Sequence, residues 1–143
     1  MRGRVLDLGC GQNGLIRHLG SGTGVDFEYT AKPDIRVKSL DKLPFDDSSF
    51  DTVTALAMLN YIPPGSAESI LKEVYRVLAP YGRLVLTVVS KWGGKLNRIR
   101  KVWEPPGMML KEVRSTVEPH QFRLTYSRPF MLGLNRLYVF GKE

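Results

Sequence analysis

The first 90 residues alternate between short apolar runs and segments in which apolar residues recur at helical spacing. The spacing over residues 15–19 predicts a short helix, and Ser66 is placed to cap a longer helix over residues 67–78. The apolar runs are typical of buried strands, which we expect over residues 4–8, 23–27, 35–40, 50–56 and 83–90. Strands that alternate with helices predict a mostly parallel sheet with helices on both faces.

The last third of the chain has a different pattern. Glycine and proline pairs surround a basic stretch over residues 91–107, and a helix is expected near residues 108–116. Two further strands, at about residues 121–126 and 134–141, have no helix between them and predict an antiparallel hairpin joined by a loop that contains Pro129 and Gly133. We therefore expect one α/β domain over residues 1–143.

Composition narrows the class of protein. A chain of 143 residues with 43% apolar and 24% charged residues is typical of one globular domain. The longest uncharged apolar run, Leu84 to Val89, is too short to span a membrane, and no signal peptide is expected. Cys10 is the single cysteine and there are two histidines, so neither a disulfide nor a structural metal site is expected. These features predict a cytoplasmic protein.

The net charge of +7 is concentrated in one part of the chain. Residues 1–88 contain equal numbers of basic and acidic residues, whereas residues 89–143 contain eleven Lys and Arg against four Asp and Glu. Arg98, Arg100 and Lys101 belong to a basic cluster that is interleaved with Trp92 and Trp103. Such a cluster favours an anionic partner: RNA, a phosphorylated metabolite or an anionic membrane surface. A solvated basic face is the alternative.

A glycine-rich loop, Gly9-Cys-Gly-Gln-Asn-Gly14, lies between the first strand and the first helix. Such a loop brings bare backbone N–H groups and a helix N-terminus to one point, which suits an anionic part of a ligand. The pattern by itself does not distinguish between cofactors. Asp7, two residues before the loop, would repel the pyrophosphate of a dinucleotide but would tolerate a ligand with an amino group and a sulfonium charge. S-adenosylmethionine (SAM) is such a ligand.

Four segments together resemble the class I SAM-dependent methyltransferases, in the subgroup that includes ubiquinone-pathway enzymes. They are Val5-Leu-Asp-Leu-Gly-Cys-Gly11, Thr23-Gly-Val-Asp26, Leu43-Pro-Phe-Asp-Asp-Ser-Ser-Phe-Asp51 and the segment from Leu71 to Leu86. The resemblance implies a Rossmann-like sheet of about seven strands, with residues 1–90 as the cofactor-binding half and residues 91–143 as a basic, substrate-side segment and terminal hairpin. It implies SAM as the cofactor and no metal. The cofactor-binding residues that it implies are Asp7, Gly9, Cys10, Gly11, Asp26, Phe27, Ser39, Leu40 and Ala57.

Three departures from the family pattern change the expectations. Relatives have helices before the first strand that partly cover the cofactor, whereas only four residues precede Val5. The site is therefore expected to be open, or to be closed by the C-terminal segment, a second subunit or a large substrate. Ser39 stands where relatives often carry an acid that holds the adenine amino group, so we expect weaker binding there. Asn60-Tyr61 replaces the Glu-His pair of the subgroup, and Pro80-Tyr81-Gly82 replaces the usual Pro-Gly-Gly turn.

The resemblance thus predicts an enzyme that transfers a methyl group from SAM to an unidentified, anionic acceptor. Two alternatives stay open: a SAM-binding partner subunit without its own activity, and a nicotinamide-dependent oxidoreductase. A partner subunit or a homo-oligomer would also cover an open site. No catalytic base is predicted: an imidazole could serve as a general base, but a surface position is the preferred interpretation for His120, and Tyr61 is expected to line the pocket. Because the sulfonium is already a strong electrophile, positioning of the acceptor suffices for transfer.

Overall fold

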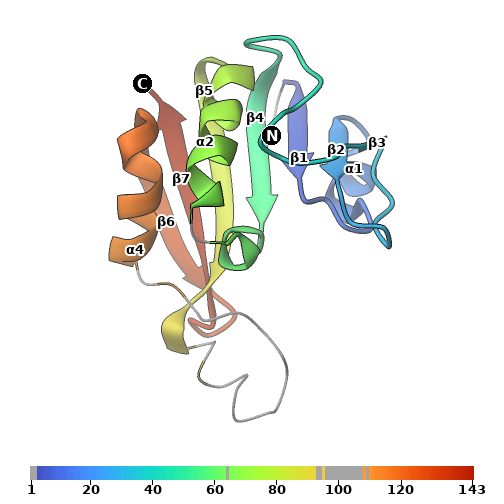
Figure 1. The fold of residues 1–143 in the computed structure, drawn as a ribbon. Helices are drawn as coiled ribbons and strands as arrows, with labels where there is room; N and C mark the ends of the chain where they lie inside the picture. The colour runs from blue at the N-terminus through green and yellow to red at the C-terminus, as the bar shows by residue number, and fades with distance from the viewer. Residues whose placement is uncertain (1–2, 64, 93–94, 96–107, 109) are drawn as a thin grey trace.

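The computed structural model describes residues 3–63, 65–92, 95, 108 and 110–143 (Figure 1). Its helices and strands follow one another in the order expected of an α/β fold. They are β1 (Val5–Leu8), α1 (Gly14–Leu19), β2 (Thr23–Asp26), β3 (Ile35–Arg36), β4 (Phe50–Leu56), η1 (Leu59–Tyr61), α2 (Ser66–Val77), β5 (Leu78–Val89), α4 (Leu110–Val117), η2 (Glu118–His120), β6 (Phe122–Phe130) and β7 (Asn135–Lys142).

All the strands form one seven-stranded sheet in the order β3-β2-β1-β4-β5-β7-β6. Strands β1 to β5 pair in parallel, whereas β7 is antiparallel to both β5 and β6. The predicted fold class is therefore confirmed, including the antiparallel C-terminal hairpin. The chain order reverses between β1 and β4, which is where ligands bind in open α/β sheets.

Different helices cover the two faces of the sheet. Leu6 and Phe140 point to one face, where they are fully buried in a core with residues of α2 and α4. Figure 1 shows these two helices side by side on that face. Val5 alternates with Leu6 and points to the opposite face, where α1 packs: a Cβ built on Gly22 would lie 2.8 Å from Ile16 Cδ1 and 3.3 Å from Val5 Cβ. We refer to the two sides as the α2 face and the α1 face.

Several predicted element boundaries are wrong, for local reasons. Strand β3 has two residues instead of six. Gly65, with a φ of 93°, occupies the N-cap of α2 in place of Ser66, which is the first helical residue. Strand β5 begins at Leu78, because the turn expected at Pro80 to Gly82 is an irregularity within the β4–β5 pairing. Pro129 lies in β6, not in the loop, because β6 is an edge strand that tolerates a missing N–H.

Most of the predicted basic segment lies outside the described residues, which omit residues 93–94 and 96–107. The role expected of Arg98, Arg100 and Lys101 therefore stays a prediction. Within the described part of the chain, Lys91 forms an ion pair with Glu112 of α4 at 2.8 Å. None of the helices in that part is long and apolar enough to cross a membrane.

Candidate functional site

The glycine loop follows β1 at the edge of the sheet where the parallel strands end. Gly9 and Gly11 have φ values of 65° and 52°, a left-handed conformation that glycine adopts without strain. The N–H groups of Gly9 and Cys10 both donate to the carbonyl oxygen of Val25, at 2.9 and 3.1 Å. These bonds fasten the loop to the end of β2. A Cβ built on Gly11 would meet nothing within 4 Å, so open space lies beside this part of the loop.

The loop also packs against β2 at unusually close range. A Cβ built on Gly24 would lie 2.1 Å from Asn13 Oδ1 and 3.0 Å from Cys10 Sγ, so only glycine fits at this position. Burial and the nearby carboxylates raise the pKa of the Cys10 thiol to about 11. Cys10 is therefore protonated at neutral pH, and its Sγ lies against β2 at Gly24. Sequence reasoning named Gly24 within a motif but did not find this contact, which depends on the strand pairing.

Two buried carboxylates lie at the ends of adjacent strands. Asp7 of β1 is 4% exposed, and Thr54 Oγ1 of β4 donates to its Oδ1 at 2.5 Å. Burial is the main cause that raises the pKa of Asp7, and the charge of Asp26 adds to it. The strand ends therefore form a region of negative potential that favours a cationic group.

Asp26, at the end of β2, connects the glycine loop to the following segment. Its Oδ2 accepts the N–H of Gly11 at 2.8 Å, and its Oδ1 accepts the N–H of Glu28 at 2.9 Å. An ionised carboxylate has about four acceptor positions, so both oxygens keep capacity for hydroxyl donors. The two backbone bonds fix the orientation of the carboxylate at the end of β2.

A cavity of about 190 Å³ lies between β2, the loop after β3 and the start of α2. Phe27, Ser39 and Leu40 are all in its lining, so the structure brings together three residues that the resemblance implied. Phe27 is 51% exposed, which leaves one side of its ring available, whereas Leu40 is buried. A flat apolar ring with polar edges fits such a lining.

The remaining lining of this cavity comes from the segment after β4 and from α2. Sequence reasoning missed most of these residues, although the position of the segment directly after a parallel strand is a usable signal. Met58 is the most informative, because a Cβ on Gly9 would lie 3.2 Å from its Sδ, so Met58 also borders the glycine loop. The lining residues from this part of the chain are Met58, Tyr61, Ile62, Pro63, Ser66 and Ile70.

Ala57 lies beside the cavity but not in its lining. It adopts a left-handed φ of 55°, and its N–H donates to the carbonyl oxygen and the hydroxyl of Thr87, at 3.0 and 2.8 Å. This bend turns the chain at the end of β4. Asn60 then holds the end of β5, because its Oδ1 accepts the N–H of Val89 at 3.0 Å. Asn60 therefore has a structural task at this edge.

His120 lies at the opposite edge of the sheet. It lies just before β6, which begins at Phe122 opposite Lys142 of β7. The neighbouring residue of β7, Gly141, pairs with Arg83, so His120 is near the N-terminal end of the regular part of β5. The glycine loop is at the other end of these strands. This placement does not support His120 as a catalytic base.

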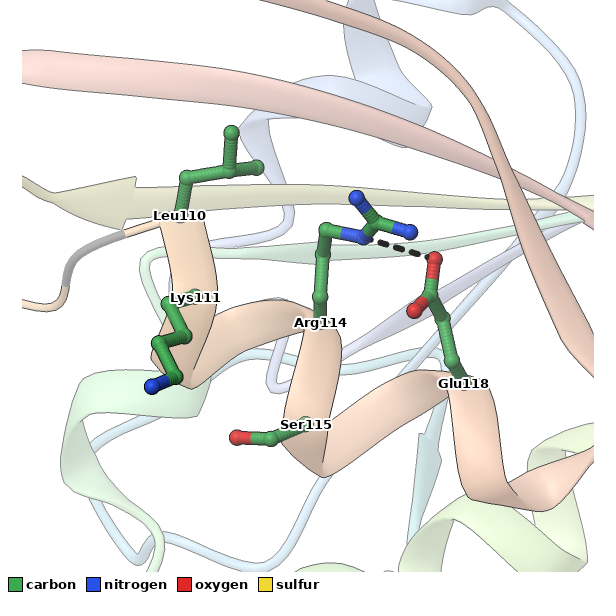
Figure 2. Close-up of a pocket in the computed structure, with 5 residues that line it drawn as sticks. All are labelled: Leu110, Lys111, Arg114, Ser115 and Glu118. Carbon is green, nitrogen blue, oxygen red and sulfur yellow. Dashed lines mark hydrogen bonds and ion pairs between the residues drawn. The ribbon is translucent and has the colours of Figure 1, made fainter.

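A cavity of about 670 Å³ lies along α4, and its lining contains none of the predicted site residues. Figure 2 shows its lining, in which Arg114 and Glu118 form an ion pair at 2.8 Å. All five lining residues come from one helical segment, so the feature is a surface groove. It offers no convergent polar groups from separate elements, unlike the crevice at the strand ends.

Comparison with known proteins shows which family the chain matches. Residues 6–86 match the family described as "Methyltransferase domain". The ubiquinone/menaquinone biosynthesis C-methyltransferase of Geotalea daltonii is 30% identical over 111 residues, which cover 62% of this chain and 46% of that protein. The chain spans less than half the length of this and other curated relatives that it matches.

Solved structures share the fold at low sequence identity. A SAM-dependent methyltransferase from Methanosarcina mazei aligns with a TM-score of 0.78 at 24% identity, covering 98% of this chain and 92% of that one. A methyltransferase from Haloferax volcanii, solved in complex with the Trm112 methyltransferase activator, aligns with a TM-score of 0.78 at 17% identity, covering 97% and 81%.

The matched residues include the glycine loop, both buried carboxylates and the segment that lines the cavity. They make up more than half of the chain. The strands among them are neighbours in the sheet order β3-β2-β1-β4-β5. The chain therefore belongs to the methyltransferase domain family.

Proposed function

We propose that this chain binds SAM at the ends of β1, β2 and β4 and transfers its methyl group to an acceptor. The observation that carries the proposal is the pair of buried carboxylates, Asp7 and Asp26, on either side of a glycine loop with open space at Gly11. Negative potential at this point favours a ligand that carries an ammonium and a sulfonium charge over one that carries a pyrophosphate.

Each predicted residue except Ala57 has a proposed task that its position supports. Asp26 would accept the ribose hydroxyls, because its two backbone bonds orient the carboxylate and leave acceptor capacity. Phe27 and Leu40 would flank the adenine ring in the 190 Å³ cavity, with the Ser39 hydroxyl at its edge. Asp7 would act through its charge, and the backbone of Gly9, Cys10 and Gly11 would line the amino-acid part of the ligand. These residues fit SAM.

The chemistry of transfer places few demands on the protein. SAM supplies a methyl group bonded to a sulfonium, so an acceptor lone pair forms the new bond to carbon while the carbon–sulfur pair returns to sulfur. The chain has to hold the acceptor in line with that bond and to exclude water. Tyr61 would contribute by lining the pocket, because it is in the lining of the cavity and is 51% exposed.

We also propose a division of labour along the chain and an anionic acceptor. Residues 1–90 would bind the cofactor, and residues 91–143, which carry the whole net charge of +7, would attract the acceptor. The acceptor would then be RNA or a phosphorylated small molecule, and the chain would act with a partner subunit or a second copy that covers the open site.

Calorimetry tests the cofactor assignment. SAM and its demethylated product should bind the chain, and NAD should bind at least about tenfold more weakly, because its pyrophosphate would approach Asp7. Equal or tighter binding of NAD would overturn the proposal. Transfer of labelled methyl groups to a panel of anionic and neutral acceptors, followed with and without candidate partners, then separates an enzyme from a non-catalytic partner subunit.

A further inference from the structure

A cavity at the C-terminal end of β5 is separate from the candidate site. It has a volume of about 230 Å³ and lies where β5 ends, α4 begins and β7 begins, at the lower end of the sheet in Figure 1. It shares no lining residue with the 190 Å³ cavity beside Phe27. The residues that line it are Ser90, Lys91, Met108, Leu110, Arg136 and Tyr138.

Tyr138 brings a buried polar group to this cavity. The residue is 1% exposed, and its ring stacks on Phe140 with the centroids 6.3 Å apart. Its hydroxyl has no hydrogen-bond partner among the residues that the structure describes. In that part of the chain, Asn13 Oδ1 is the one side-chain atom that is both sealed from solvent and unpartnered, so the Tyr138 hydroxyl opens into the cavity. An acceptor placed there would satisfy a donor that is costly to leave unpaired.

Arg136 places a positive charge beside this hydroxyl. Arg136 pairs with Val88, and Tyr138 pairs with Leu86, so the two side chains are two positions apart in β7 and point to the α2 face. Burial raises the pKa of Tyr138, and the charge of Arg136 opposes that rise, which shows that the two groups are close.

The half-buried guanidinium of Arg136 keeps most of its donors. Its Nη1 donates to Ser127 Oγ at 3.4 Å, and no acid in the described part of the chain forms an ion pair with it. A guanidinium presents its N–H groups as a planar fork, which matches the geometry of a carboxylate. Arg136 and Tyr138 therefore offer donors from one side of the cavity to a single acceptor group.

The other cation in the lining already has an acidic partner. Lys91 Nζ lies 2.8 Å from Glu112 Oε1, and both side chains are about half exposed. The charge of Arg136 is therefore the excess charge of the lining, as far as the described residues go. A single excess charge in a partly buried site favours a monoanion over a dianion, because a second negative charge would lose its hydration without gaining a partner.

An apolar path leads from this cavity along the α2 face. Met108 also lines a cavity of about 420 Å³, in which Leu59 and Ala67 are further lining residues. Ile62 and Pro63 line both that cavity and the one beside Phe27. An aliphatic chain that passes Met108 would therefore stay in contact with apolar side chains.

We propose that the cavity at Arg136 and Tyr138 binds a small aliphatic carboxylic acid. The carboxylate accepts hydrogen bonds from the Arg136 guanidinium and the Tyr138 hydroxyl, and the aliphatic chain lies along Met108. We call this the carboxylate site. It goes beyond the proposed function, because the ligand is held by residues outside the cofactor crevice and binds whether or not SAM is present.

A series of small molecules tests the proposal on the full chain without SAM. In NMR titrations of the isotope-labelled protein, hexanoate should bind more tightly than acetate, by at most about fourfold for each added methylene group. Hexylamine has the same chain with the opposite charge and should not bind. Inorganic phosphate should bind more weakly than hexanoate, because it carries more negative charge and no chain. Absence of hexanoate binding, or equal binding of hexylamine or phosphate, would overturn the proposal.

Variants locate the binding. Arg136→Gln should weaken hexanoate binding at least about tenfold, and Tyr138→Phe, which removes one hydroxyl, should weaken it about tenfold. Because that hydroxyl has no partner among the described residues, Tyr138→Phe should not lower the Tm. Arg128→Gln is the matched control: Arg128 is in the same hairpin but pairs with Leu137, which points to the opposite face.

The control and two further measurements separate the possible outcomes. Arg128→Gln should leave hexanoate binding unchanged, and Arg136→Gln should leave SAM affinity unchanged, so a failure of the carboxylate site is distinct from a failure of the cofactor assignment. Circular dichroism confirms that each variant is folded. If folded Arg136→Gln binds hexanoate as tightly as the parent, or if Arg128→Gln weakens binding as much, the carboxylate site is not at Arg136 and the proposal is wrong.

Discussion

At the scale of single residues, the two carboxylates of the strand ends are stabilised to different degrees. Asp26 accepts two backbone N–H groups, whereas Asp7 is held by the hydroxyl of Thr54 and is buried beside another acid. Burial therefore raises the pKa of Asp7 above its usual value. The ionised carboxylate of Asp7 therefore lowers the stability of the fold at neutral pH. A cationic ligand bound beside it would offset this loss of stability.

Asp7→Asn should stabilise the protein at neutral pH. Because the folded state holds the Asp7 proton more tightly than the unfolded state, ionisation reduces stability as the pH rises from the unfolded pKa of about 3.9. The Tm of the variant should match that of the parent near about pH 3 and exceed it increasingly toward about pH 7. Thermal unfolding across this range measures the difference. A Tm difference that does not change with pH would contradict the assignment. The variant should also bind SAM more weakly.

Gly24→Ala should destabilise the protein and distort the cofactor loop. The added Cβ would lie 2.1 Å from Asn13 Oδ1, which forces the loop away from β2. We expect a loss of about 1–3 kcal/mol in the free energy of unfolding, as for other overpacked sites. Gly14→Ala is the control for denaturant unfolding, because a Cβ there meets nothing within 4 Å and its φ is ordinary. If both substitutions have the same effect on stability, the close packing of loop and strand is refuted.

At the scale of elements, α2 fixes the loop that leads into β4. The Arg76 guanidinium donates to the carbonyl oxygens of Leu43 and Phe45, at 3.2 and 2.8 Å, and pairs with Asp47 and Glu73. Apolar spacing predicted the helix and its buried face. It contained no signal for the contacts with Leu43, Phe45 and Asp47, because these partners come from a loop about 30 residues earlier in the chain.

Arg76→Gln should cost about 1.5–3 kcal/mol of unfolding free energy, because it removes charged hydrogen bonds to Leu43, Phe45 and Glu73, which are buried or half-buried. Lys72→Gln is the matched control on the same helix. Lys72 pairs only with Glu68, both side chains are more than 60% exposed, and its loss should cost about 0.3–0.5 kcal/mol. Urea denaturation of the two variants gives both values. Similar losses would mean that the network does not hold the loop.

At the scale of the whole molecule, the sequence predicted those features that depend on residues close together in the chain. The loop from Gly9 to Gly14, the carboxylates and the order of the strands follow from spacing and from turn residues. The contact of Gly24 with Asn13 and the contact of Met58 with Gly9 depend on which strands pair and in what register. Periodicity along one chain carries no information about those pairings, so these features could not be predicted.

The same limit applies to the ends of elements. Pro129 was expected in a loop, and it lies in β6 because that strand is at the edge of the sheet, a fact of topology. The start of β5 was misplaced because Tyr81 adopts a φ of 62° within the strand pairing instead of ending it. Ser39 lies in the lining of the cavity, and its role in binding the cofactor stays a prediction.

The most direct test of the account is the affinity of SAM for Asp26→Ala, measured by calorimetry beside the parent chain. Loss of the charged acceptor should weaken binding by about 1.5–3 kcal/mol, or roughly 10- to 150-fold. Asp46→Ala removes the same charge from an exposed loop position and should leave the affinity unchanged. Asp26→Asn, which keeps the shape and one acceptor, should fall between the two. If Asp26→Ala is folded by circular dichroism and binds SAM as tightly as the parent, the cofactor does not lie at the ends of β1 and β2, and the central claim is wrong.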